Sequence, residues 1–285
     1  MHNSLPAIIS IHIATLLFGL AGVLGAAVDL GPIEITFGRT LFASIALLAV
    51  FILSGKVETP VITRLSVFAG LLLAIHWISF FASILHSTVA VGLITFSTCP
   101  VFVALLEPKI FSEKFRPVTL IAALFVLVGV FIITGAATGD TVFIKGIAYG
   151  IFSGASFAVL QLINRHLAKT SGPVATSLIQ NSVASLLLLP VVGGGLAAIQ
   201  SDQWLTLAFL GVGCTALAHT LFIYSLKRVR VATASMIAAG LEPVYGIALA
   251  AVLLAQWPGH HVFVGGFIIL ATVLLISGKS VARTE

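Results

Sequence analysis

The sequence predicts an all-α membrane protein: ten transmembrane helices form two inverted five-helix repeats, and both the N- and C-termini are cytoplasmic. The first support for this fold class is the composition. Apolar residues make up 59% of the 285 residues, charged residues make up only 8%, and the mean hydropathy is +1.20. Because soluble domains carry about a quarter charged residues, this composition argues against a soluble enzyme, a nucleic-acid-binding protein or a disordered chain.

The second support is a series of apolar runs, each close to the length that crosses a bilayer. A hydrocarbon core about 30 Å thick takes about 20 helical residues. The runs cover residues 7–28, 33–53, 65–85, 89–106, 118–135, 143–163, 174–192, 204–226, 232–254 and 262–277. Turn-forming Gly, Pro and Asp residues separate them. The first run has no Lys or Arg before it and is longer than the apolar part of a typical signal peptide, so we expect it to be a helix of the mature protein.

The third support is a similarity between the two halves, which predicts one repeat over residues 1–140 and an inverted one over residues 141–285. Residue pairs recur at a near-constant offset: Pro32 with Pro173, His76 with His219, Pro100 with Pro243, and Gly19 with Gly154. Five helices per repeat make the second copy enter the membrane from the opposite side. A cytoplasmic N-terminus places 12 of the 14 Lys and Arg residues inside, as the positive-inside rule requires. Inverted repeats are typical of secondary transporters.

Two short motifs then indicate a family. The stretch from Glu242 through Pro243 to Gly246 resembles the Glu-Pro signature of the EamA-type exporters in the drug/metabolite transporter superfamily. The stretch from Pro100 to Glu113 keeps that family's spacing from proline to acid. One departure lies in the first helix, where Phe18 precedes Gly19 and many relatives have Trp. This puts any role of an indole in that helix in doubt.

The resemblance implies a function. Within the family the chain is most similar to exporters of aromatic and hydrophobic amino acids. We therefore expect a secondary transporter of the inner (cytoplasmic) membrane that exports small metabolites by alternating access. Its midplane cavity would be lined by the first, third, fourth, sixth, eighth and ninth helices. The family pattern places the fifth and tenth helices at the periphery, and the runs 118–135 and 262–277 contain no ionisable residue.

Glu242 is the strongest candidate for a functional residue. It lies near the middle of the run 232–254, and Pro243 removes a backbone hydrogen bond, which is expected to open or kink the helix there. A carboxylate beside freed carbonyls can bind a cation or a substrate amine, or carry a proton; the alternative is a structural carboxylic acid. Helical spacing places Ser235, Glu242 and Tyr245 on one face of this helix. Pro100 is the matching helix-breaking position in the first repeat.

Arg39 lies seven residues into the run 33–53, towards the predicted outer face. It could bind a substrate carboxylate through its planar fork. It could also extend to the outer headgroups, since six residues rise about 9 Å. A third interpretation is an ion pair with Glu34 or Glu242. The sequence leaves these three interpretations open.

The other candidates are uncharged or weakly basic. His76 and His219 either line the cavity and relay protons or join helices by hydrogen bonds. No third ligand has metal-binding spacing, so no metal site is expected. In the sixth helix, Tyr149, Ser153, Phe157 and Gln161 follow helical spacing. In the third, Trp77 and Phe80 form an aromatic pair. Each of these sets predicts a cavity wall, with helix packing as the alternative.

No motif for nucleotide binding, zinc-dependent proteolysis or serine hydrolysis occurs, so we expect no catalytic residue and no cofactor. Cys99 and Cys214 lie within apolar runs and are interpreted as small hydrophobic residues. The expected partners are a small-molecule substrate, with amino acids favoured, and the lipid bilayer; a monomer is compatible with these features. The alternatives are export of another metabolite or a cationic drug, a passive channel, or a structural membrane protein.

Overall fold

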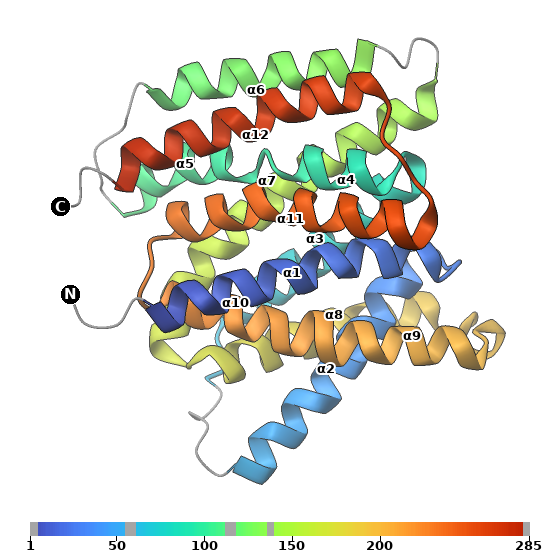
Figure 1. Ribbon diagram of the computed structural model, residues 1–285. Helices are drawn as coiled ribbons and strands as arrows, with labels where there is room; N and C mark the ends of the chain where they lie inside the picture. Colours follow the sequence, from blue (N-terminus) through green and yellow to red (C-terminus); the bar gives the residue numbers. More distant parts are fainter. Residues whose placement is uncertain (1–4, 55–60, 112–117, 136–139, 282–285) are drawn as a thin grey trace.

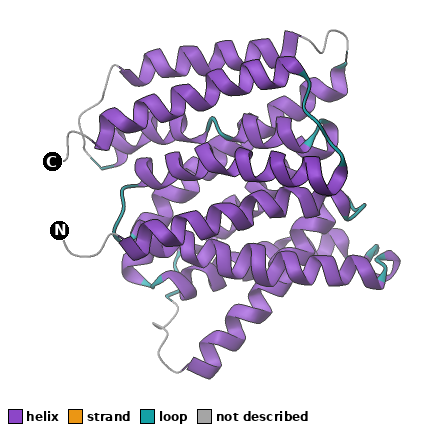
Figure 2. Ribbon diagram, in the orientation of Figure 1, coloured by secondary structure: helices purple, strands orange, loops and turns teal. Residues whose placement is uncertain are grey.

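The computed structural model describes residues 5–54, 61–111, 118–135 and 140–281, and within these ranges it contains helices and no strands (Figure 2). Eight segments are long and apolar enough to cross a membrane. They are Leu5–Ala27, Pro32–Leu53, Arg64–His86, Val89–Ile110, Thr141–Thr170, Pro173–Val192, Ser201–Leu226 and Val231–Leu254; His260–Thr272 is a shorter apolar helix. The protein is therefore a multi-pass membrane protein.

The first half of the chain folds into helices whose limits follow the apolar runs. They are α1 (Leu5–Ala27), α2 (Pro32–Ser54), α3 (Arg64–His86), α4 (Val89–Phe96), α5 (Cys99–Ile110) and α6 (Val118–Gly135). One expected helix is divided, because the run 89–106 forms both α4 and α5. Pro100 has no N–H to donate to the carbonyl of Phe96, and the helix is interrupted just before it. Glu113, the acid of the first motif, lies outside the described residues.

The second half has a similar order of helices with two differences. Its helices are α7 (Thr141–Thr170), α8 (Pro173–Val192), α9 (Ser201–Gly211), α10 (Ala218–Leu226), α11 (Val231–Leu254) and α12 (His260–Val281). A π-helical segment, Val212–Leu217, joins α9 to α10. Pro243 does not interrupt α11, which is continuous. The expected opening of the helix at Pro243 is therefore absent.

The helices form one bundle in which α6 and α12 lie side by side along one edge (Figure 1). This is the peripheral position that the family resemblance implied for the fifth and tenth helices. Their backbones approach closely at two glycines: a Cβ built on Gly129 would lie 2.8 Å from the carbonyl oxygen of Gly265. Outward-facing side chains of this pair are exposed, as expected for contact with lipid, including Phe131 and Phe267, each at 74%.

The start of α1 and the end of α12 lie on the same side of the bundle, at the left of Figure 1. The largest apolar cluster occupies the centre, where α1, α3, α7, α10 and α11 meet. Its buried aromatic side chains include those that line the candidate site.

Candidate functional site

A small buried cavity lies at the centre of the bundle. Its walls are six aromatic or imidazole rings and one carboxylate: Phe18, His76, Trp77, Phe80, Phe96, Phe157 and Glu242. They come from α1, α3, α4, α7 and α11. The cavity volume is about 10 Å³, which is close to the space that one water molecule needs. In this state the site is closed, and no amino acid fits into it.

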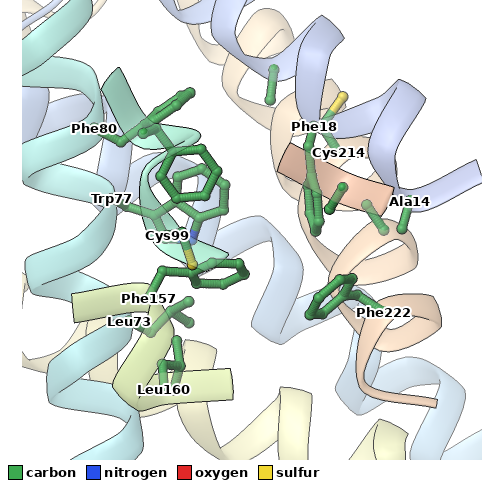
Figure 3. Close-up of a cluster of buried hydrophobic side chains, with 14 of the residues drawn as sticks. Ala14, Phe18, Leu73, Trp77, Phe80, Cys99, Phe157, Leu160, Cys214 and Phe222 are labelled. Carbon is green, nitrogen blue, oxygen red and sulfur yellow. The ribbon is translucent and has the colours of Figure 1, made fainter. Parts of the chain in front are cut away.

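The rings of the cavity pack against one another from two sides. His76 stacks on Phe157, with ring centroids 4.5 Å apart, and Trp77 meets Phe80 edge-on at 5.6 Å. Phe18 approaches from α1, 6.3 Å from Trp77 and 6.0 Å from Phe222 of α10. Figure 3 shows Trp77, Phe80 and Phe157 on one side, and Phe18 and Phe222 on the other. Such edge-to-face and tilted pairs stabilise a packed aromatic core.

Glu242 is the acidic residue of this cavity. It is only 3% exposed, and its carboxylate forms no hydrogen bond or ion pair with any residue that the structure describes. The positive charge of Arg39 acts on it through space without direct contact. The other buried acid, Glu107, behaves differently, since it forms an ion pair with Arg165 at 3.0 Å. A buried carboxylate without a fixed partner is suited to bind a ligand cation or a proton.

His76 is held in one orientation by α7. Its Nδ1 lies 2.8 Å from the hydroxyl and 3.3 Å from the carbonyl oxygen of Ser153, and that hydroxyl donates to the carbonyl of His76. Because a carbonyl oxygen only accepts, both contacts of Nδ1 are compatible with a proton on this nitrogen. The second histidine has a different role. His219 does not line the cavity; its Nε2 lies 3.3 Å from Oε1 of Gln180, which in turn bonds Asn164.

Arg39 is fully buried, so the interpretation in which it extends to the headgroups is wrong. Its Nε donates to the hydroxyl of Thr215 at 2.8 Å, and its Nη2 donates to the carbonyl of Cys214 at 3.1 Å. The guanidinium carbon lies 3.5 Å above the centre of the Trp77 ring. Both hydrogen-bond partners belong to the π-helical segment, where the Thr215 hydroxyl donates to the carbonyl of Leu210, five residues earlier. Single π-helical turns are frequent at functional sites.

A separate polar cluster joins α5, α7 and α11. Nε2 of Gln161 donates to the sulfur of Cys99 at 3.3 Å, and the same sulfur lies 3.6 Å from the hydroxyl of Ser235. All three side chains are buried, and both cysteines of the chain are free thiols. Gln161 thus contacts this cluster and does not line the cavity. Cys99 has a polar role here that its apolar surroundings did not predict.

The carbonyl that Pro243 leaves without a backbone donor has a contact in the other half of the chain. Pro243 cannot donate to the carbonyl of Ala239, and the hydroxyl of Ser97 lies 2.8 Å from that oxygen and 2.9 Å from the carbonyl oxygen of Leu93 in its own half. Ser97 is one of the two residues between α4 and α5. The segment between α4 and α5 thus places a hydroxyl beside the carbonyl that Pro243 leaves without a backbone donor in the continuous helix α11.

Replacing Ser97 by alanine should leave the buried carbonyl of Ala239 without a donor. We expect a loss of about 0.6–2 kcal/mol in the free energy of unfolding, measured by thermal denaturation in detergent. Ser79→Ala is the matched control, because the Ser79 hydroxyl is buried and bonds only carbonyls of its own helix. Equal destabilisation by both substitutions would contradict a role for Ser97 between the helices.

The structure thus brings together part of the predicted set. Glu242, His76, Trp77, Phe80 and Phe157 line the cavity, and Ser153 and Arg39 contact residues that line it. Two tyrosines lie elsewhere. Tyr149 is 41% exposed on the outer side of α7, where its ring lies 5.6 Å from that of His86. Tyr245 is half-buried where α11 meets Gly19 of α1.

Sequence reasoning missed four residues of the site, and one of them, Phe18, was noted only as a departure from the family pattern. Phe96 and Phe222 are ordinary members of apolar runs, and nothing in their spacing separates them from residues that face lipid. Ser97 could have been suspected, because it lies close to the proline that interrupts its helix. Its partner Ala239 is 142 residues away, however, and no local pattern connects the two.

Comparison with known proteins identifies the family to which the chain belongs. The model of the EamA-like transporter family matches the chain twice, over residues 5–135 and 144–278. The chain belongs to the EamA-like transporter family. This EamA-like protein is a membrane transporter and not an enzyme.

Its relatives agree with that assignment. The uncharacterized transporter YxxF of Bacillus subtilis (strain 168) is 24% identical over 278 residues, which cover 94% of this chain and 88% of the relative. An uncharacterized transporter of Archaeoglobus fulgidus is 27% identical over 266 residues, covering 93% and 94%. A crystal structure with 18% identity superposes with a TM-score of 0.70 over 95% of this EamA-like chain and 98% of the other, which shows the shared fold.

Proposed function

We propose that this EamA-like protein is a secondary transporter that exports small metabolites, most favourably aromatic and hydrophobic amino acids, by alternating access. The observation that supports this proposal is the composition of the closed cavity. Six rings offer an apolar, stacking surface, and Glu242 offers a negative charge for an ammonium group. Ligand sites of this kind combine mostly apolar walls with a few polar groups that fix orientation.

The proposed topology has ten spans, cytoplasmic termini, and repeats at residues 1–140 and 141–285, in an inner membrane. The two family-model matches and the contacts of two corresponding glycines support it. A Cβ built on Gly19 of α1 would lie 3.1 Å from the carbonyl oxygen of Glu242 in α11. A Cβ on Gly154 of α7 would lie 2.9 Å from the carbonyl oxygen of Phe96, next to the first proline. Each glycine thus packs on the proline-containing region of the opposite half.

In the proposed mechanism the bundle rocks about the closed cavity and opens it to one side of the membrane at a time. Since the closed cavity holds about one water molecule, substrate enters only when the rings separate. The unpartnered carboxylate of Glu242 then takes the ammonium group of the substrate, and the rings contact its side chain. Protonation of Glu242 from the other side would release the substrate.

Counterflow in proteoliposomes tests this function. Vesicles containing the purified protein are loaded with one unlabelled amino acid, and uptake of labelled phenylalanine is followed. We expect saturable uptake that internal phenylalanine or methionine stimulates and internal glutamate does not, because the cavity has apolar walls and a negative charge.

Protein-free vesicles are the control for leakage. Uptake that does not saturate and is indifferent to internal substrate would indicate a passive channel. No uptake of any amino acid by correctly folded protein would reject this substrate class and direct the search to organic cations and other metabolites.

A further inference from the structure

We propose that the guanidinium of Arg39, stacked on the indole of Trp77, is an anion-binding group of the transport site and takes the carboxylate of the substrate. The identity of this anion as an amino-acid carboxylate rests on the proposed function. The need for an anion rests on the surroundings of Arg39 alone. A small inorganic anion such as chloride has the same charge, and the experiment below separates the two sources.

The first argument is the imbalance of charge around a buried cation. Arg39 is 0% exposed, and its direct partners are a hydroxyl, a backbone carbonyl and two aromatic rings, those of Trp77 and, at 5.3 Å, Phe81. These groups satisfy Nε and Nη2 and interact favourably with the guanidinium, but none carries a full negative charge. Burying a cation away from water is costly unless an anion or a strong hydrogen-bond network compensates for it. Arg39 has only part of such a network.

The second argument is a comparison with another arginine. Arg165 forms an ion pair with Glu107 at 3.0 Å although its side chain is 21% exposed. Arg39 is buried more deeply, yet no carboxylate of the described residues lies within ion-pair distance of it. Glu242 acts on it only through space. A purely structural arginine at this depth would be expected to have the partner that Arg165 has.

The third argument is the presence of unused donors. Nη1 of Arg39 is buried and has no acceptor among the residues that the structure describes, and the same is true of Nε1 of Trp77. The two side chains are stacked, so two unsatisfied N–H groups belong to one contact. A carboxylate has two oxygens, each of which accepts such bonds, and a charge-assisted bond to guanidinium is strong.

The position of Trp77 connects this pair to the cavity. Trp77 lines the cavity beside Glu242 and also lies under Arg39. An amino acid carries an ammonium and a carboxylate group, and the site offers an acid and an arginine with aromatic rings between them. In the closed state Arg39 is not a lining residue, so the substrate reaches it when the bundle opens and the indole shifts.

Equilibrium binding of labelled phenylalanine to purified protein in detergent tests the proposal. Competition by phenethylamine, which lacks the carboxylate, and by chloride, with methanesulfonate, which has no carboxylate, as the replacement anion, identifies the anion. We expect phenethylamine to bind at least about 30-fold more weakly than phenylalanine. Arg39→Gln should weaken the binding of phenylalanine by a similar factor and leave the affinity for phenethylamine within about threefold of the wild-type value. Arg39→Lys should retain part of the affinity for phenylalanine that Arg39→Gln loses. Arg64→Gln, at an exposed position, should change the affinity for neither ligand.

The outcomes separate this proposal from the proposed function. Equal affinities for phenylalanine and phenethylamine in the wild-type protein would overturn the carboxylate site while leaving amino-acid transport in place, and this comparison needs no variant to fold. If phenylalanine does not bind but chloride raises the melting temperature of the wild type and not of Arg39→Gln, the anion is inorganic and the substrate carboxylate is overturned. If the binding of neither phenylalanine nor chloride depends on Arg39, the arginine has a structural role and the proposal is overturned.

Discussion

Glu242→Gln is expected to abolish the dependence of transport on a pH gradient while substrate exchange continues. Glutamine has nearly the same shape and can still accept a hydrogen bond from an ammonium group, but it cannot take up a proton. In the proposed mechanism, proton and substrate compete for the one carboxylate of the cavity, and an acidic exterior drives export by protonating it. The variant should therefore show counterflow without stimulation by the gradient.

The measurement is substrate efflux from proteoliposomes with and without an imposed pH gradient. Asp202→Asn serves as the matched control, because this exposed acid lies in the first turn of α9. Full gradient-driven efflux by Glu242→Gln would exclude this carboxylate as the proton carrier. A wild-type protein that is indifferent to the gradient would instead identify facilitated diffusion.

Gly154→Leu is expected to have the largest effect on folding. A side chain at this position would meet backbone atoms, with the carbonyl oxygen of Phe96 at 2.9 Å and the backbone nitrogen of Cys99 at 3.2 Å from the new Cβ. Backbone atoms cannot move aside as the end of a side chain can. Overpacking in a well-packed core costs typically about 1–3 kcal/mol and occasionally more, so the melting temperature in detergent should fall by several degrees.

Gly213→Leu is the control for this substitution, since a Cβ there finds only the ring of Phe209, at 3.9 Å. The corresponding position in the other half is a second test. Gly19→Leu should destabilise the protein as Gly154→Leu does, because its Cβ would lie 3.0 Å from the backbone nitrogen of Gly246. If Gly154→Leu is as stable as the wild type, α7 does not approach the segment from Phe96 to Cys99 as closely as described.

The helices were largely predictable because a bilayer imposes their length and polarity. The run 7–28 corresponds to α1 (Leu5–Ala27), and the run 232–254 corresponds to α11 (Val231–Leu254). The transporter class and the family were predictable as well, from the composition, the repeat and the Glu-Pro motif. A single feature of the sequence, the length of apolar runs, thus locates most of the fold.

The candidate site was only partly predictable, because its contacts join distant segments. Arg39 and Thr215 lie 176 positions apart, and no local pattern distinguishes this pairing from extension to the headgroups. The two prolines show the same difficulty. Local reasoning gives both the same effect, but Pro243 receives a donor from Ser97 of the other half, and its helix continues. The hydroxyl beside the freed carbonyl comes from a residue 142 positions away, so no local pattern shows this contact.

The glycine contact between α6 and α12 limits how the molecule can move. Each of these helices is the last of its half of the chain, and their backbones approach closely at Gly129 and Gly265, where the side chains of Ile133 and Ile269 pack against the opposite glycine. The two halves of the chain therefore pack closely against each other along the outer edge of the bundle, away from the closed cavity. A motion that opens the cavity has to preserve this line of contact. The two halves are therefore expected to rotate about the contact between α6 and α12 and not to separate along it.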